Sequence, residues 1–145
     1  MIEQLSVFLE NQPGRLAQAC RTLGSAGINM RALMVADTEQ FGVVRIICDR
    51  PNAAKGALEG AGFGVSVTGV YAVETPDRPG GLADVLEALG SAGINVEYAY
   101  CFLEPGENAA VNVLKIDEGD ARDVLEAAGF RVLRPGELYE PDTDS

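Results

Sequence analysis

An internal repeat constrains this sequence more than any other feature. Residues 13–29 and 79–95 align without a gap at an offset of 66, and 11 of the 17 aligned positions are identical. A second block of similarity follows at an offset of 67, where residues 57–63 face 124–130. Two blocks in the same order identify a duplicated unit of about 67 residues. Each copy is near the lower size limit for an independent core, so we expect two small domains packed side by side.

Hydrophobic periodicity predicts the order βαββαβ in both copies. Leu5, Val7 and Leu9 alternate with polar or outward positions, as in a half-buried strand, and a helix with apolar spacing follows Gly14. The predicted strands are 3–9, 28–36, 41–48, 64–67, 70–75, 94–103, 109–116 and 131–133. The first predicted helix follows the turn at Pro13 and Gly14, the next two begin at Pro51 and Gly81, and the last follows Asp120, which we expect to cap it. The fold class is therefore α+β: two ferredoxin-like domains, each an antiparallel sheet with helices on one face.

The boundaries of these domains follow from the repeat. We expect one domain at residues 1–68, a second at 69–134 and an acidic C-terminal tail at 135–145 that is solvated and partly disordered. Thr68 and Gly69 are the only residues between the last predicted strand of the first copy and the first strand of the second. Hairpin turns are expected at residues 37–40 and 105–108.

The charge balance excludes several classes of partner. The chain has 22 acidic and 11 basic residues, which give a formal net charge of −11. A surface this acidic repels phosphate groups, so we expect neither nucleic-acid binding nor binding to anionic membranes. No apolar run reaches the roughly 18 residues of a membrane span, and no signal-like segment follows Met1, so we expect a cytoplasmic protein.

The residues that usually perform catalysis are scarce. Histidine is absent, and the three cysteines, Cys20, Cys48 and Cys101, show no CxxC spacing. We expect all three cysteines to serve packing. Without histidine, and without paired carboxylates, the sequence predicts no catalytic residues, no metal site, no cofactor and no enzymatic activity.

The duplicated turn is the candidate binding feature. It runs from Asn11 to Leu16 in the first copy and from Asp77 to Leu82 in the second. Backbone N–H groups at a glycine-containing helix start favour a carboxylate, and the amide of Asn29 or of Asn95 offers a donor and an acceptor. An amino acid carries both charges. The alternative is that each turn only connects a strand to a helix, with its leucine as a core anchor.

These motifs resemble those of the ACT domain, an amino-acid-binding regulatory module found beside many enzymes of amino-acid metabolism. The resemblance rests on [Asn/Asp]-x-Pro-Gly-x-Leu after a short strand and on Gly-Ile-Asn entering the next strand, both present twice within residues 1–134. It implies that an effector binds where the first loop and helix start of one domain meet the second strand of a neighbour. The ligand-binding residues so implied are Asn11, Gln12, Pro13, Gly14, Arg15, Leu16, Ile28, Asn29, Met30, Asp77, Arg78, Pro79, Gly80, Gly81, Leu82, Ile94, Asn95 and Val96.

The sequence contains two such modules and no recognisable catalytic domain. We therefore expect a stand-alone tandem sensor that binds a small amino acid, forms a homodimer and transmits occupancy to a separate enzyme or regulator. Two alternatives stay open at this point. One is a structural or assembly module that binds no ligand, and the other, less favoured, is an enzyme.

Overall fold

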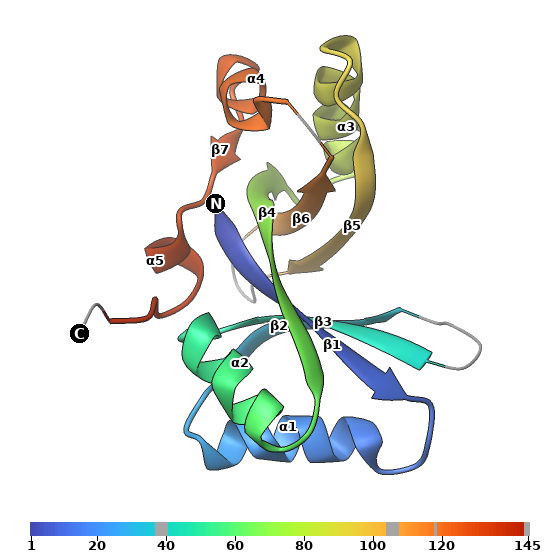
Figure 1. Cartoon of the computed structure of the whole chain (residues 1–145). Helices are drawn as coiled ribbons and strands as arrows, with labels where there is room; N and C mark the ends of the chain where they lie inside the picture. The colour runs from blue at the N-terminus through green and yellow to red at the C-terminus, as the bar shows by residue number, and fades with distance from the viewer. Residues whose placement is uncertain (37–40, 104–107, 118, 144–145) are drawn as a thin grey trace. The chain divides into compact units, whose positions relative to one another are not determined.

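The computed structural model describes residues 1–36, 41–103, 108–117 and 119–143 (Figure 1). The chain divides into two compact units. The N-terminal unit comprises Glu3–Thr68 with the C-terminal segment Pro135–Ser145, and the C-terminal unit comprises Gly69–Arg134 with Met1–Ile2. The hairpin turn predicted at 37–40 lies outside the described residues, as does most of the turn predicted at 105–108.

The N-terminal unit has the predicted βαββαβ order. Its elements are β1 (Ile2–Glu10), α1 (Arg15–Ser25), β2 (Met30–Ala36), β3 (Phe41–Cys48), α2 (Pro51–Gly60) and the first part of β4 (Gly64–Pro76). The strands follow the order β2-β3-β1-β4. Strand β3 pairs antiparallel with both β1 and β2, with Val44 opposite Val7 on one side and Val35 on the other. The antiparallel sheet predicted from the sequence is confirmed.

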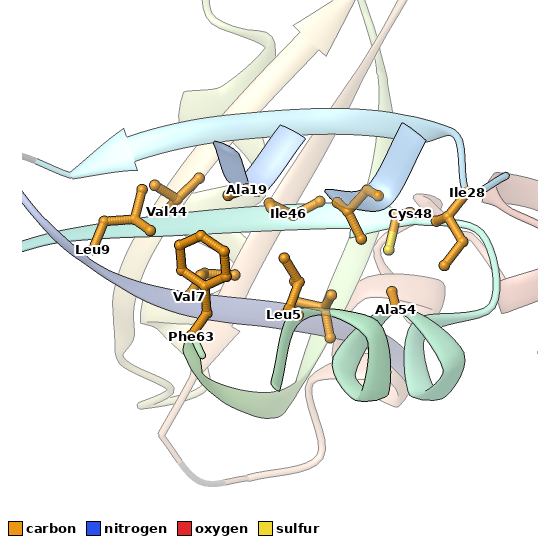
Figure 2. Close-up of a cluster of buried hydrophobic side chains, with 12 residues drawn as sticks. Leu5, Val7, Leu9, Ala19, Ile28, Val44, Ile46, Cys48, Ala54 and Phe63 are labelled. Carbon is orange, nitrogen blue, oxygen red and sulfur yellow. The ribbon is translucent and has the colours of Figure 1, made fainter. Parts of the chain in front are cut away.

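The core of this unit lies between the sheet and its two helices. The alternation of β1 turns Leu5, Val7 and Leu9 to the helix side, where they are at most 4% exposed. Figure 2 shows these side chains converging with those of Ala19 on α1 and Ala54 on α2. Both helices therefore bury their apolar stripes against the same face of the sheet.

The C-terminal unit repeats the arrangement. Its elements are the second part of β4, α3 (Gly81–Ser91), β5 (Val96–Leu103), β6 (Ala109–Ile116), α4 (Ala121–Ala127) and β7 (Arg131–Val132). The strand order is β7-β4-β6-β5. Val85 and Leu89 of α3 and Leu125 of α4 are fully buried against Val73 and Leu114 of the sheet. The Asp120 carboxylate caps α4 by accepting from the backbone N–H of Asp123, as the sequence predicts.

The junction between the copies differs from the prediction of two short strands. β4 is a single strand of 13 residues that runs through Thr68 and Gly69. Both residues lie within the strand and not in a turn. Thr68 is β-branched and favours extended backbone. Gly69 has no side chain, which allows the Met1 side chain to lie close to its backbone. A Cβ atom added at Gly69 would lie 2.7 Å from Cε of Met1. The strand that closes one copy therefore opens the next.

The C-terminal segment also differs from the prediction of a solvated tail. It forms a short helix, α5 (Pro135–Leu138), and then places Tyr139 in the N-terminal unit with only 5% of its surface exposed. The Tyr139 hydroxyl accepts a hydrogen bond of 3.1 Å from the backbone N–H of Glu3. The acidic composition does not indicate this docking, because the segment is held by backbone groups and by the carboxylates of Asp49 and Asp142.

Several positions are more exposed than their helical spacing predicts. Leu16 on α1 and Leu82 and Leu86 on α3, which the helical spacing assigns to the inward face, are 36–39% exposed. Cys48 is buried as predicted, but Cys20 is half-buried and Cys101 is exposed on β5. None of the helices in the described ranges is both long and apolar enough to span a membrane.

Candidate functional site

The two duplicated turns adopt the same backbone conformation. Gly14 and Gly80 precede α1 and α3 with φ angles of 87° in both cases, a left-handed conformation that favours glycine. In each turn the glycine carbonyl accepts the first helical hydrogen bond, from Gln18 at 2.9 Å and from Asp84 at 3.0 Å. A glycine at the N-cap position has no side chain with which to cap its own helix. The repeated glycine is thus required by the turn itself.

The first turn borders a small hollow. Asn11, Gln12 and Leu16 line it together with Val35 and other residues of β1 and β3, and its volume is about 120 Å³. This volume is below the roughly 300–1,000 Å³ that is typical of small-molecule sites. The structure brings these three predicted residues together, but the space at this turn is small.

The second turn borders a much larger cavity of about 640 Å³. This volume lies within the roughly 300–1,000 Å³ that is typical of small-molecule sites. Among the residues predicted to bind ligand, only Arg78 lines it. The other lining residues, which sequence reasoning did not single out, are Glu74, Thr75, Pro76, Asp84, Asn108, Ala109, Gly129, Phe130 and Arg131.

Two ion pairs lie at the wall of this cavity. Arg78 contacts Asp84 at 2.8 Å, and Arg131 contacts Glu74 at 2.9 Å. All four side chains are partly exposed, so each pair is screened by water and contributes little to stability. These pairs matter for ligand binding, because two guanidinium groups and two carboxylates line the same cavity.

A buried polar pair lies beside the cavity. The Asn112 amide donates to Thr75 Oγ1 at 2.9 Å and to the Val73 carbonyl at 3.2 Å. Thr75 and Asn112 are each 2% exposed. At the corresponding positions the first copy has Leu9 and Val44, which are both apolar. The polar groups therefore belong to the second copy alone.

Asn29 and Asn95 lie at the opposite end of their units from the turns. Asn29 follows α1, whose 11 residues span about 16 Å, whereas Gly14 precedes that helix. Ile28 is buried in the core, the Asn29 side chain is exposed, and the Asn29 carbonyl accepts from the backbone N–H of Asp49 at 3.0 Å. Within one unit, a small ligand at the turn does not reach Asn29.

Asp49 connects the entry of β2 with the C-terminal segment. Its carboxylate accepts from Arg31 Nε at 3.1 Å, from Arg31 Nη2 at 2.8 Å and from the backbone N–H of Glu140 at 2.7 Å. Burial by itself raises the pKa of the Asp49 carboxyl, but these hydrogen bonds outweigh it and hold the pKa below its ordinary value. Asp49 is therefore ionised at neutral pH. Sequence reasoning missed this cluster because its partners are 18 and 91 positions away.

Comparisons with known proteins give a consistent picture. The model of a family described as the ACT domain pair matches residues 1–134. The crystal structure of a Bacteroides thetaiotaomicron protein is 36% identical, with a TM-score of 0.88 and coverage of 94% of each chain. The regulatory subunits of aspartate kinase from Thermus thermophilus and Thermus flavus are 19% and 20% identical, with TM-scores of 0.64 and 0.63; the alignments cover 87% and 88% of this chain and 87% and 90% of theirs. At that identity the two subunits show the shared fold alone. No curated protein matches the chain.

Proposed function

This chain belongs to the family of ACT domain pairs, and from that premise we propose that it is a cytoplasmic regulatory protein that binds a small amino acid. Occupancy of its site is passed to a separate enzyme or regulator, and the protein itself has no catalytic activity. The observation that carries this proposal is the cavity beside the second duplicated turn. Its wall presents two arginines and two carboxylates to a space of ligand size, and an amino acid carries one charge of each sign.

The relatives support a role separated from catalysis. Two proteins of the same fold are regulatory subunits of aspartate kinase. By analogy, this protein regulates a partner that is a different polypeptide. The analogy concerns the kind of role and not the identity of the amino acid or of the partner.

The duplicated turns supply the proposed contacts. Backbone N–H groups near Gly14 or Gly80 bind the ligand carboxylate, and the amide of Asn29 or Asn95, contributed by the partner copy in a homodimer, pairs with the other end of the ligand. Because each asparagine lies at the far end of its own unit, this mode requires two domains for one ligand. That requirement accounts for a chain that has retained both copies of both segments.

Isothermal titration of the full chain with each proteinogenic amino acid tests the proposal. We expect one or a few amino acids to bind. Asn29→Ala or Asn95→Ala should weaken binding about 5- to 150-fold, which corresponds to about 1–3 kcal/mol for a hydrogen bond to a charged group. If the parent protein binds no amino acid, the regulatory proposal fails and a structural or assembly module takes its place.

A further inference from the structure

The two copies of the turn differ in the space beside them, and this difference identifies a site. We infer that the cavity next to Gly81 in the C-terminal unit is itself the amino-acid site, built within one domain, and that Arg15 fills the corresponding place in the N-terminal unit. The inference rests on the proposed function for the class of ligand, a small amino acid. It replaces the two-domain contacts described above with a site inside one domain, and it names the lining residues and the kind of side chain the ligand carries.

In the N-terminal unit the space is occupied by the protein. The guanidinium carbon of Arg15 lies 4.5 Å from the centre of the Phe63 ring, a cation–π contact, and Arg15 Nη1 donates to Gln18 Oε1 at 2.7 Å. Phe63 is only 4% exposed beneath it. Arg15 therefore covers the aromatic ring that ends the α2–β4 turn.

In the C-terminal unit the same place is open. Gly81 aligns with Arg15, and Phe130 aligns with Phe63. A Cβ atom added at Gly81 would lie 2.8 Å from the Pro76 carbonyl oxygen, so the backbone at this position is too close to its neighbour to carry a side chain. With no side chain to cover it, Phe130 is half-buried and lines the cavity.

The charges of the cavity are also found in one copy only. The cavity is lined by Glu74, Arg78, Asp84 and Arg131, whereas the aligned positions of the first copy are Phe8, Gln12, Gln18 and Gly64. All four charged groups are thus absent from the first copy. The turn has the same backbone conformation in both copies. The turn alone therefore does not account for the four charged residues found only in the second copy.

The chemistry of the lining defines the ligand. Two arginines and two carboxylates give a formal charge of zero, which matches a zwitterion with an uncharged side chain. A guanidinium group of Arg78 or Arg131 can bind the α-carboxylate in a two-pronged geometry, and Glu74 or Asp84 can accept from the ammonium group. Opening exposed ion pairs to admit the ligand costs little. The Phe130 ring then offers an apolar surface to the ligand side chain.

The test compares variants of the full chain by isothermal titration with each proteinogenic amino acid. We expect the parent to bind one molecule per chain, of an amino acid with an uncharged side chain. Arg131→Gln removes a cavity charge at an exposed position and should weaken binding about 10-fold or more. Gly81→Ala should weaken it further by displacing the Pro76 carbonyl. The matched control is Arg122→Gln, since Arg122 pairs with Glu126 on α4 and does not line the cavity.

The outcomes separate this inference from the proposed function. If an amino acid binds the parent and Arg131→Gln alike, while Asn29→Ala or Asn95→Ala weakens binding, the regulatory proposal stands and the cavity is not the site. Equal losses in Arg131→Gln and Arg122→Gln, or two molecules bound per chain, also overturn the inference. If Gly81→Ala does not fold, Arg131→Gln decides alone. A parent that binds no amino acid overturns both proposals.

Discussion

The carboxylate of Asp142 caps a helix that begins 91 residues earlier: its Oδ2 atom lies 3.0 Å from the backbone nitrogen of Asn52. The Oδ1 atom lies 3.1 Å from the backbone nitrogen of Ala53, so the two oxygens satisfy two N–H groups at the start of α2. The residue that precedes the helix, Arg50, has a left-handed φ of 46° and provides no side-chain cap. The C-terminal segment therefore supplies what the local sequence of α2 lacks.

Replacing Asp142 should destabilise the N-terminal unit. Asp142→Ala leaves the first N–H groups of α2 without their acceptor and should lower the free energy of unfolding by about 1 kcal/mol, as for other helix caps. Urea unfolding followed by circular dichroism measures this change. Glu87→Ala, which removes one negative charge from an exposed position on α3, is the control. Equal stability of the two variants would show that Asp142 does not act as a cap.

Acid should weaken the cluster around Asp49. Because the folded protein lowers the pKa of Asp49, its ionised form contributes stability above the unfolded-state value of about 3.9, and this contribution is lost as the pH falls through the lower folded-state value. Asp49→Asn should cost about 2 kcal/mol near neutral pH, because the hydrogen bonds from Arg31 and Glu140 are charge-assisted.

The pH dependence provides the check on Asp49. The difference in unfolding free energy between the parent and Asp49→Asn should stay constant between about pH 7 and 5 and shrink below about pH 4. A difference that instead grows as the pH is lowered would contradict the sign assigned to the Asp49 pKa.

The repeat made most of the fold predictable, since alternating strands and helices bounded by glycine are local patterns. The turns at Gly14 and Gly80 were recognisable for the same reason. What the sequence did not reveal depends on contacts between distant residues: Tyr139 against Glu3, and Phe130 and Arg131 beside the second turn. The difference between Arg15 and Gly81 was visible in the alignment of the copies. The alignment did not show what this difference does, because only the structure places Arg15 over the Phe63 ring.

The three cysteines should differ in their reactivity. Burial, together with the nearby charges of Asp49 and Asp142, raises the pKa of the Cys48 thiol to about 12, so it stays protonated and unreactive at neutral pH. Cys101 is exposed and should react first with a maleimide, whereas the half-buried Cys20 should react more slowly. Mass spectrometry of digests taken over time, with and without urea, measures the order. Modification of Cys48 in the folded protein at the rate of Cys101 would contradict the burial of β3.

Two glycines, Gly56 within α2 and Gly62 just after its end, should respond to alanine in opposite directions. Gly56 lies inside the helix and Gly62 follows its end, and an added Cβ atom meets no other atom within 4 Å at either position. An added methyl group therefore makes no steric clash at either position, and the two positions differ in backbone conformation. Gly56→Ala should stabilise the protein by about 0.5–1 kcal/mol, because alanine restricts the unfolded chain and favours helix.

Gly62 has a φ of 93°, which alanine adopts only with strain, so Gly62→Ala should destabilise the protein by about 1–2 kcal/mol. The same urea unfolding experiment measures both variants, and the sign of the change decides. Both residues lie outside the two cavities, so amino-acid binding should be unchanged in Gly56→Ala. A stabilising effect of Gly62→Ala would contradict the left-handed conformation of Gly62.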